Sequence, residues 1–222
     1  MIYLQQLLSQ SGIASRRRAT ELIKSGKIKI NDKIAQAGQK IDPQKDKVKL
    51  NNKLIKPQIK RIYYLVNKPV GYACTTRDSH SVKKVVDLVP AKSKVWPVGR
   101  LDKDSSGLII LTNDGELTHR LTHPSFLHEK EYLVTFDKTV KASLLSKLIK
   151  GVKLREGLAK VDKLKKINDT KLSLTIHQGW NRQIRRMFKQ CGYQVIGLER
   201  IRIGKIKLGN LRPGQYIKLS NL

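Results

Sequence analysis

The sequence predicts a mixed α+β protein with two domains, a small α/β module over residues 1–60 and a larger domain over residues 61–222 with a mostly antiparallel sheet. Three observations support this fold class. Near the N-terminus, leucines at helical spacing and helix-capping residues precede a short alternating strand pattern. From Arg61 onward, short β-branched or apolar runs alternate with helix-like segments. Between the two parts, residues 45–60 are polar, basic and include Pro57, which is typical of a linker.

Two short helices and a strand are expected in the small module. The first helix ends at Gly12, and the second is capped by Ser15 and ends at Gly26. The strand Lys27 to Ile30 follows, and Asn31-Asp32 forms a turn. The side chains expected to face inward from the helices are Leu4, Leu7, Leu8, Ala19, Leu22 and Ile23.

The second helix carries a basic face. This face and its extension consist of Arg16, Arg17, Arg18, Lys24 and Lys27. Three arginines at the start of a helix lie next to the positive end of its dipole, which is unfavourable. We therefore expect an external anion to compensate for that cost. The alternative is a basic face that is merely solvated.

The charge of the whole chain indicates a polyanionic partner. It has 46 Lys and Arg against 17 Asp and Glu, a formal net charge of +29. Nucleic acid is the first interpretation, and an anionic membrane surface is the second. No apolar run approaches the roughly 20 residues needed to span a bilayer, and the N-terminus does not resemble a signal peptide. Cys74 and Cys191 match no metal-binding spacing, so we expect two free thiols in a reducing cytoplasm.

The larger domain is expected to combine strands and helices in alternation. The predicted strands are IYYLVNKP, LIILTNDG, KEYLVTF and KLSLTIH. The predicted helices cover residues about 82–88, 115–121, 140–151 and 181–191.

The most informative segment of the larger domain is VGRLDKDSSGLIILTNDGE, residues 98–116. It places Asp102 in a polar turn just before a hydrophobic strand, where a side chain is rigidly presented to a ligand. Arg100 and Lys103 flank Asp102, and positive charge favours the carboxylate form that acts as a nucleophile or a base. By itself this pattern is more typical of a turn or capping aspartate. That is the role expected of Asp104, Asp114 and Glu116.

Two resemblances refine this interpretation. SGIASRRRATELIKSGKIKIN, residues 11–31, resembles the S4 RNA-binding domain. GRLDKDSSGLIILTNDGEL resembles the catalytic motif of the pseudouridine synthases related to RsuA, RluB, RluE and RluF, and three further segments match that family in order. These segments are VNKPVGYACTT, HEKEYLVTF and QGWNRQIRRMF.

The resemblance implies a catalytic set and a reaction. Asp102 is the essential carboxylate, Tyr132 stacks on the uracil and assists removal of the C5 proton, and Arg185 pairs with Asp102. Uridine becomes pseudouridine without net redox change or group transfer, so no cofactor and no metal is expected. Two routes are open, attack of Asp102 on C1′ or abstraction of the C2′ proton to give a glycal.

The expected partner is ribosomal RNA. The residues of the motifs are more similar to those of family members that modify large-subunit rRNA. Arg100, Arg182 and Arg186 are candidates for RNA contacts, with Lys189 and Arg200 also near the last motif. The substrate is free rRNA or a ribosome assembly intermediate, and the chain is expected to be a monomer. The first alternative is a non-catalytic S4-type RNA-binding ribosome-assembly factor. The second is a DNA-binding regulator, suggested by charge alone.

Overall fold

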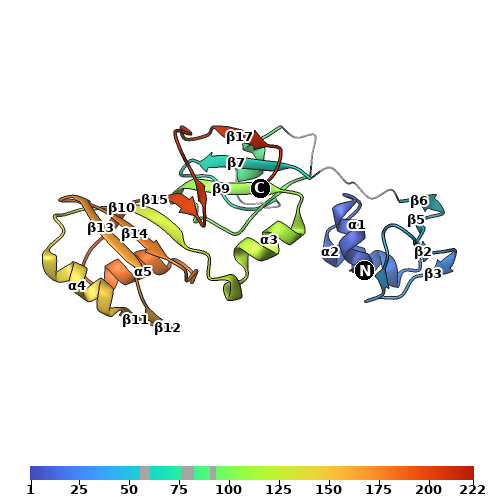
Figure 1. Cartoon of the computed structure of the whole chain (residues 1–222), viewed down its shortest axis with the longest axis horizontal. Helices are drawn as coiled ribbons and strands as arrows, with labels where there is room; N and C mark the ends of the chain where they lie inside the picture. Colours follow the sequence, from blue (N-terminus) through green and yellow to red (C-terminus); the bar gives the residue numbers. More distant parts are fainter. Residues whose placement is uncertain (56–60, 77–82, 91–93) are drawn as a thin grey trace. The chain divides into compact units, whose positions relative to one another are not determined.

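The computed structural model in Figure 1 describes residues 1–55, 61–76, 83–90 and 94–222. The chain forms two compact units, Met1–Arg61 and Ile62–Leu222. Each unit has its own hydrophobic core. The predicted α+β class is confirmed. Among the residues that the structure describes, there is no helix with the length and apolar character needed to cross a bilayer.

The first unit consists of two helices and short strands. Helix α1 (Leu4–Gln10) and helix α2 (Arg16–Lys24) are the two predicted helices, and the Ser15 side chain accepts a hydrogen bond from the Arg18 backbone N–H as the predicted N-cap. A four-stranded sheet has the order β3-β2-β5-β6, and β1 pairs with β4. The strands are β1 (Ile2–Tyr3), β2 (Ile28–Ile30), β3 (Lys33–Ile34), β4 (Lys40–Ile41), β5 (Val48–Leu50) and β6 (Lys53–Leu54).

The prediction of a linker over residues 45–60 is wrong for its first part. Strands β5 and β6 lie there as a hairpin, and Val48 and Ile55 belong to the core of the first unit. Asn51 and Asn52 have positive φ angles of 47° and 65°, the conformation of a type I′ hairpin turn. The lysines between the apolar residues made this hairpin resemble a polar connection. Residues 56–60, with Pro57, lie outside the described residues.

The second unit is organised around a nine-stranded sheet. Its order is β13-β14-β10-β15-β9-β7-β17, with β16 added to β15 and β8 added to β9. All neighbouring strands are antiparallel except β15 and β9, which run parallel, so the predicted mostly antiparallel sheet is confirmed. The strands are β7 (Tyr63–Lys68), β8 (Trp96–Pro97), β9 (Ser106–Thr112), β10 (Lys130–Phe136), β13 (Lys163–Asn168), β14 (Lys171–Ile176), β15 (Val195–Ile203), β16 (Ile206–Lys207) and β17 (Tyr216–Leu219).

Helices and a separate hairpin complete the second unit (Figure 1). They are α3 (Gly115–Thr122), α4 (Ala142–Lys150), α5 (Gln183–Gln190), the 3-10 turns η1 (Val85–Leu88) and η2 (Pro124–Phe126), and the hairpin β11 (Val152–Leu154) with β12 (Gly157–Ala159). Three predicted helices are therefore confirmed. The helix predicted over residues 82–88 is wrong, because only a 3-10 turn is present at Val85–Leu88, and Val82 lies outside the described residues. Adjacent β-branched valines disfavour a longer helix there.

The central strand β9 is buried on both faces. Ile109 and Leu111 pack into the main core together with residues of α4, α5 and β10, whereas Leu108 and Ile110 pack into a second cluster on the opposite face. The side chains of Leu108, Ile109, Ile110 and Leu111 are all fully buried. The start of β9 is consequently a rigid support for the loop that precedes it.

Candidate active site

The loop between β8 and β9 carries Asp102, as the sequence predicted. Three contacts hold this loop in place. The Ser105 N–H donates to the Asp102 carbonyl at 3.1 Å, and the Gly71 N–H donates to the Lys103 carbonyl at 2.7 Å. The Leu101 N–H donates to the Cys74 sulfur at 3.3 Å. The Asp102 carboxylate is therefore presented from a fixed backbone, with 26% of its side chain exposed.

A cavity of about 380 Å³ lies next to Asp102, a volume within the range of small-ligand sites. Tyr132 of β10 lines it, and only 8% of this residue is exposed. The other polar or charged side chains of the lining are Arg100, Ser105, Thr122, Lys130, Gln178, Asn181, Arg182, Gln183 and Arg200. The structure thus brings Asp102 and Tyr132 to one cavity, although they are 30 residues apart in the sequence. A second, more open hollow of about 720 Å³ also includes Asp102, together with Gly71 and Cys74.

The arginine that approaches Asp102 is Arg182. Its guanidinium lies 3.8 Å from the Asp102 carboxylate and forms a two-pronged hydrogen bond with Asp104 at 2.9 and 2.7 Å. Arg182 has a left-handed backbone conformation just before α5, with φ of 46°. This local geometry directs the guanidinium towards the loop of the two aspartates.

Arg185 does not form the predicted pair with Asp102. It lies one turn further along α5, where its guanidinium donates to the Val195 carbonyl and to the Asp104 carbonyl, both at 2.8 Å. Its Nε also lies 3.3 Å from the Asp104 carboxylate. Arg185 is not one of the described residues that line the cavity. Its position ties the aspartate loop to the beginning of β15.

Asp104 has a larger role than the expected turn residue. The hydrogen bond from Arg182, followed by the charges of Arg185 and Arg182, holds the pKa of the Asp104 carboxyl below its usual value. The same contact raises the pKa of Arg182. The spacing of two residues between Asp102 and Asp104 was the available signal, since both carboxylates lie in one loop. Asp114, in contrast, is the predicted capping residue and accepts from the N–H groups of Glu116 and Leu117.

The burial of two cations, Lys68 and Arg200, was not predicted from the sequence. Lys68 is fully buried, its ammonium donates to the Pro69 and Tyr72 carbonyls at 2.9 Å, and burial lowers its pKa. Arg200 was a candidate for contacts with the RNA backbone, but only 3% of it is exposed. A charged residue within an apolar strand, as in YLVNK and GLERI, was the signal that would have identified them.

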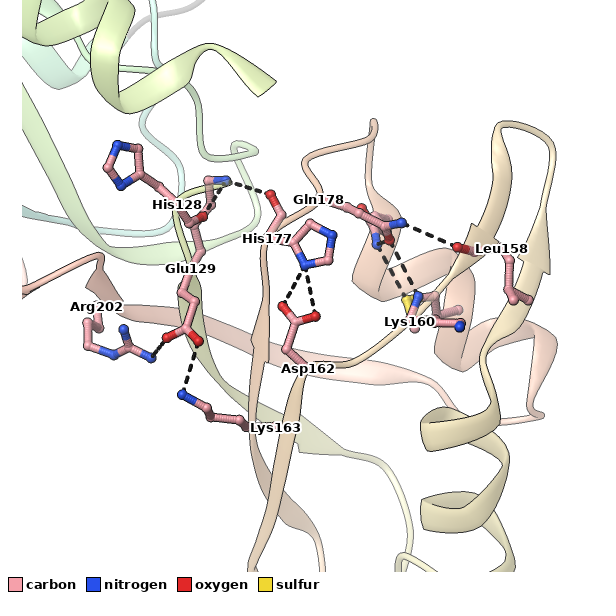
Figure 2. Close-up of polar contacts among 12 residues, drawn as sticks. His128, Glu129, Leu158, Lys160, Asp162, Lys163, His177, Gln178 and Arg202 are labelled. Carbon is pink, nitrogen blue, oxygen red and sulfur yellow. Dashed lines mark hydrogen bonds and ion pairs between the residues drawn. The ribbon is translucent and has the colours of Figure 1, made fainter. Parts of the chain in front are cut away.

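Residues 178–183, which belong to the lining of the cavity, are held by polar contacts. Figure 2 shows those of Gln178 and of the preceding His177. His177, the residue after β14, places its Nδ1 at 2.8 and 2.9 Å from the two oxygens of Asp162. The amide of Gln178 donates to the Leu158 carbonyl at 3.3 Å, and its oxygen accepts from the Lys160 N–H at 3.4 Å and from Gln183 at 2.7 Å. These contacts fix the cavity-lining residues 178–183 between β14 and α5.

The predicted RNA-binding cations differ in their availability. Arg16, Arg17, Lys24 and Lys27 of the first unit are exposed, whereas Arg18 forms an ion pair with Glu21 at 2.5 Å. Arg100 is exposed at the edge of the cavity. Arg186 forms a two-pronged pair with Glu156 at 2.8 Å, so its charge is partly neutralised within the second unit.

Arg186 also lines a hollow of about 580 Å³. The other residues of its lining are Lys153, Leu154, Arg155, Lys189 and Gln190.

Comparison with known protein families agrees with this architecture. The profile of the RNA pseudouridylate synthase family matches residues 62–190, and that of the S4 domain matches residues 4–48.

Curated relatives are similar over almost the whole chain. A dual-specificity RNA pseudouridine synthase RluF from Escherichia coli strain K12 is 40% identical over 99% of this chain and 76% of its own length. The ribosomal large subunit pseudouridine synthase B of Bacillus subtilis is 37% identical over 98% of this chain and 91% of its own length. An uncharacterized RNA pseudouridine synthase of Aquifex aeolicus is 37% identical over 99% of this chain and 90% of its own length.

Solved structures show the same fold. A crystal structure of a pseudouridylate synthase aligns with a TM-score of 0.70 at 30% identity, covering 99% of this chain and 96% of the other. The archaeal box H/ACA sRNP Nop10-Cbf5 complex aligns with a TM-score of 0.50 at 18% identity over 70% of this chain and 52% of the other, a likeness of fold alone.

Proposed function

The chain belongs to the RNA pseudouridylate synthase family, and from this premise we propose that it isomerises a specific uridine of ribosomal RNA to pseudouridine, with Asp102 as the catalytic carboxylate. The observation that carries the proposal is the position of Asp102 at the cavity lined by Tyr132 and Arg182. Large-subunit rRNA is the favoured substrate, since one relative is a ribosomal large subunit pseudouridine synthase.

The reaction breaks the bond between N1 of uracil and C1′ of ribose and forms a bond between C5 and C1′. The C5 proton leaves, and a proton returns to N1, so the atoms of substrate and product balance. The Asp102 carboxylate begins the reaction by attacking C1′ or by taking the C2′ proton to give a glycal. In both routes the Arg182 guanidinium, 3.8 Å away, stabilises and orients the carboxylate.

Tyr132 and Arg185 have different tasks in this proposal. The Tyr132 ring holds the uracil by stacking, and its hydroxyl assists removal of the C5 proton. Arg185 is a positioning residue, because its hydrogen bonds end on backbone carbonyls of Asp104 and Val195. It keeps the loop of Asp102 at a fixed distance from β15.

Exposed cations supply the binding energy for the RNA. The target uridine has to leave its stack, which costs a few kcal/mol, and contacts to phosphates offset that cost. Arg16, Arg17 and Arg18, with Lys24 and Lys27, contribute from the first unit, and Arg100 and Arg182 from the second, together with the partly buried Arg186. We propose that the enzyme acts as a monomer in the cytoplasm on rRNA, free or in an assembly intermediate.

The test is to incubate the protein with unmodified rRNA of both subunits and map pseudouridine by carbodiimide-blocked primer extension. We expect a new stop in large-subunit rRNA with the wild type and none with Asp102→Asn. Binding of RNA without a stop on any rRNA or assembly intermediate would favour the non-catalytic RNA-binding factor instead.

A further inference from the structure

Arg200 is a buried cation that lines the cavity of Asp102 and has one donor without a partner among the described residues. Its Nε donates to the Leu108 carbonyl at 2.8 Å and its Nη1 to the Arg100 carbonyl at 3.4 Å. Its Nη2 is buried and, within the described part of the chain, has no hydrogen-bond partner. A buried donor without a partner is costly, so the position indicates an occupant with acceptor atoms.

Lys130 extends this cationic region. It lines the same cavity, and its ammonium donates to the carbonyls of His128 and His177 at 3.3 and 3.2 Å (Figure 2). An ammonium has three N–H groups, so one remains for an occupant. Burial, and then the charge of Arg200, lowers the pKa of Lys130, which agrees with two cations lying close together.

Tyr132 connects the two cations. It lies two residues after Lys130 on β10, so both side chains point to the same face of the sheet. In the register of β10 and β15, Tyr132 lies directly opposite Arg200. Lys130, Tyr132 and Arg200 therefore form one continuous wall of the cavity.

The charge of the cavity lining suits an anionic occupant. Among the residues that the structure describes, the lining contains four Lys or Arg side chains and one acidic side chain. The cations are Arg100, Lys130, Arg182 and Arg200, and the acid is Asp102. Arg182, with 44% of its side chain exposed, and Arg100 are accessible to phosphates. Arg200 is almost completely buried, so the part of a nucleotide that reaches it is the base.

We propose that Arg200 and Lys130 bind the carbonyl oxygens of the uracil and stabilise the negative charge that the base acquires when the N1–C1′ bond breaks. This inference rests on the proposed function. The electron pair of the broken bond remains on the base, where N1 and the O2 and O4 atoms share the charge. It is consumed when C5 bonds to C1′, so neither cation has to transfer a proton. Donors facing O4 also select uracil over cytosine, whose C4 amino group is itself a donor.

The test measures single-turnover rates at saturating enzyme and RNA affinity separately. For Arg200→Met we expect a rate loss of about a hundredfold, with the dissociation constant for rRNA changed by less than about threefold. Arg200→Lys keeps the charge and restores part of the rate. Lys130→Met loses about tenfold or more by the same reasoning.

Arg202→Met is the matched control. Arg202 lies on the same strand but pairs with Glu131 at 2.8 Å and with Glu129 at 3.1 Å, and it is not among the described residues that line the cavity. Figure 2 shows its contact with Glu129. This variant should retain a rate within about threefold of wild type. Thermal unfolding of each variant checks the fold.

Two results would overturn the inference. One is an equal rate loss in Arg200→Met and Arg202→Met. The other is weaker RNA binding with an unchanged rate at saturation, which would identify a phosphate contact. If Arg200→Met does not fold, an unchanged rate in Lys130→Met overturns the inference. In each of these cases the proposed function stands if the wild type forms pseudouridine and Asp102→Asn does not. If the wild type forms no pseudouridine, both the proposed function and this inference are overturned.

Discussion

Gly107 and Arg200 contact each other so closely that a Cβ on Gly107 would overlap the carbonyl oxygen of Arg200. The two residues are partners in the parallel pairing of β9 and β15. Gly107 also has a φ of 104°, a conformation that other residues rarely adopt. This contact joins the strand that follows Asp102 to the strand that carries Arg200.

Gly107→Ala is therefore expected to lower the free energy of unfolding by roughly 2 to 4 kcal/mol, because the overlap is with backbone atoms that cannot move aside. Gly71→Ala is the control, since Gly71 has a similar φ of 92° but no atom within 4 Å of its Cβ position. It should cost only about 1 to 2 kcal/mol of backbone strain. Urea unfolding measures both, and equal losses would refute the steric argument.

The lowered pKa of Asp104 predicts that the free energy of unfolding depends on pH in a specific way. Its pKa is lowered in the folded protein, mainly by the hydrogen bond from Arg182. A lowered carboxyl pKa stabilises the fold above the unfolded value of about 3.9, and the contribution disappears as the pH falls through the folded value. The advantage of wild type over Asp104→Asn in urea unfolding should consequently be present at pH 7 and shrink below about pH 4. In an Arg182→Gln background the difference at pH 7 should be smaller but not absent, because Arg185 still lies 3.3 Å from the Asp104 carboxylate. A difference of full size in that background would contradict this explanation.

The basic face of α2 predicts a change in salt dependence. Arg16 and Arg17 are exposed, and each contact with a phosphate adds about 0.7 to 0.9 to the slope of log affinity against log salt. The double substitution Arg16→Gln and Arg17→Gln should lower the slope for rRNA binding by about 1.5. Arg18→Gln should change it less, because Arg18 already pairs with Glu21. A slope unchanged by the double substitution would mean that this face is merely solvated.

A substitution of Tyr132 should distinguish its stacking role from its role in proton transfer. Tyr132→Phe retains the ring, so RNA affinity and thermal stability should stay near wild type, whereas the single-turnover rate should fall by about a hundredfold. Tyr64→Phe is the control, because Tyr64 is a buried tyrosine of β7 that packs edge-on against Tyr216. A full rate in Tyr132→Phe would limit the role of Tyr132 to stacking.

Local patterns allowed the sequence to predict much of this structure. The Ser15 cap, the strand that ends at Lys68 and the loop of Asp102 depend on residues close together in the chain. The hairpin of β5 and β6 was mistaken for a linker, since its strands are only three and two residues long and carry lysines.

The missed part of the site depends on contacts between distant segments. Asp104 meets Arg182 across 78 residues, and Arg200 reaches the Leu108 carbonyl across 92. Helical or strand periodicity contains no information about such pairs. The predicted partner of Asp102 was therefore Arg185, whereas the fold places Arg182 beside it.

The most direct test compares the two neighbouring carboxylates in one assay. Pseudouridine formation in the mapped rRNA fragment is followed under single-turnover conditions for wild type, Asp102→Asn and Asp104→Asn. We predict a loss on the order of 10⁴-fold for Asp102→Asn, comparable to the removal of a central catalytic group, and only about tenfold for Asp104→Asn, which misplaces Arg182. A near-normal rate in Asp102→Asn, or a complete loss in Asp104→Asn alone, would contradict the assignment of Asp102 as the catalytic residue.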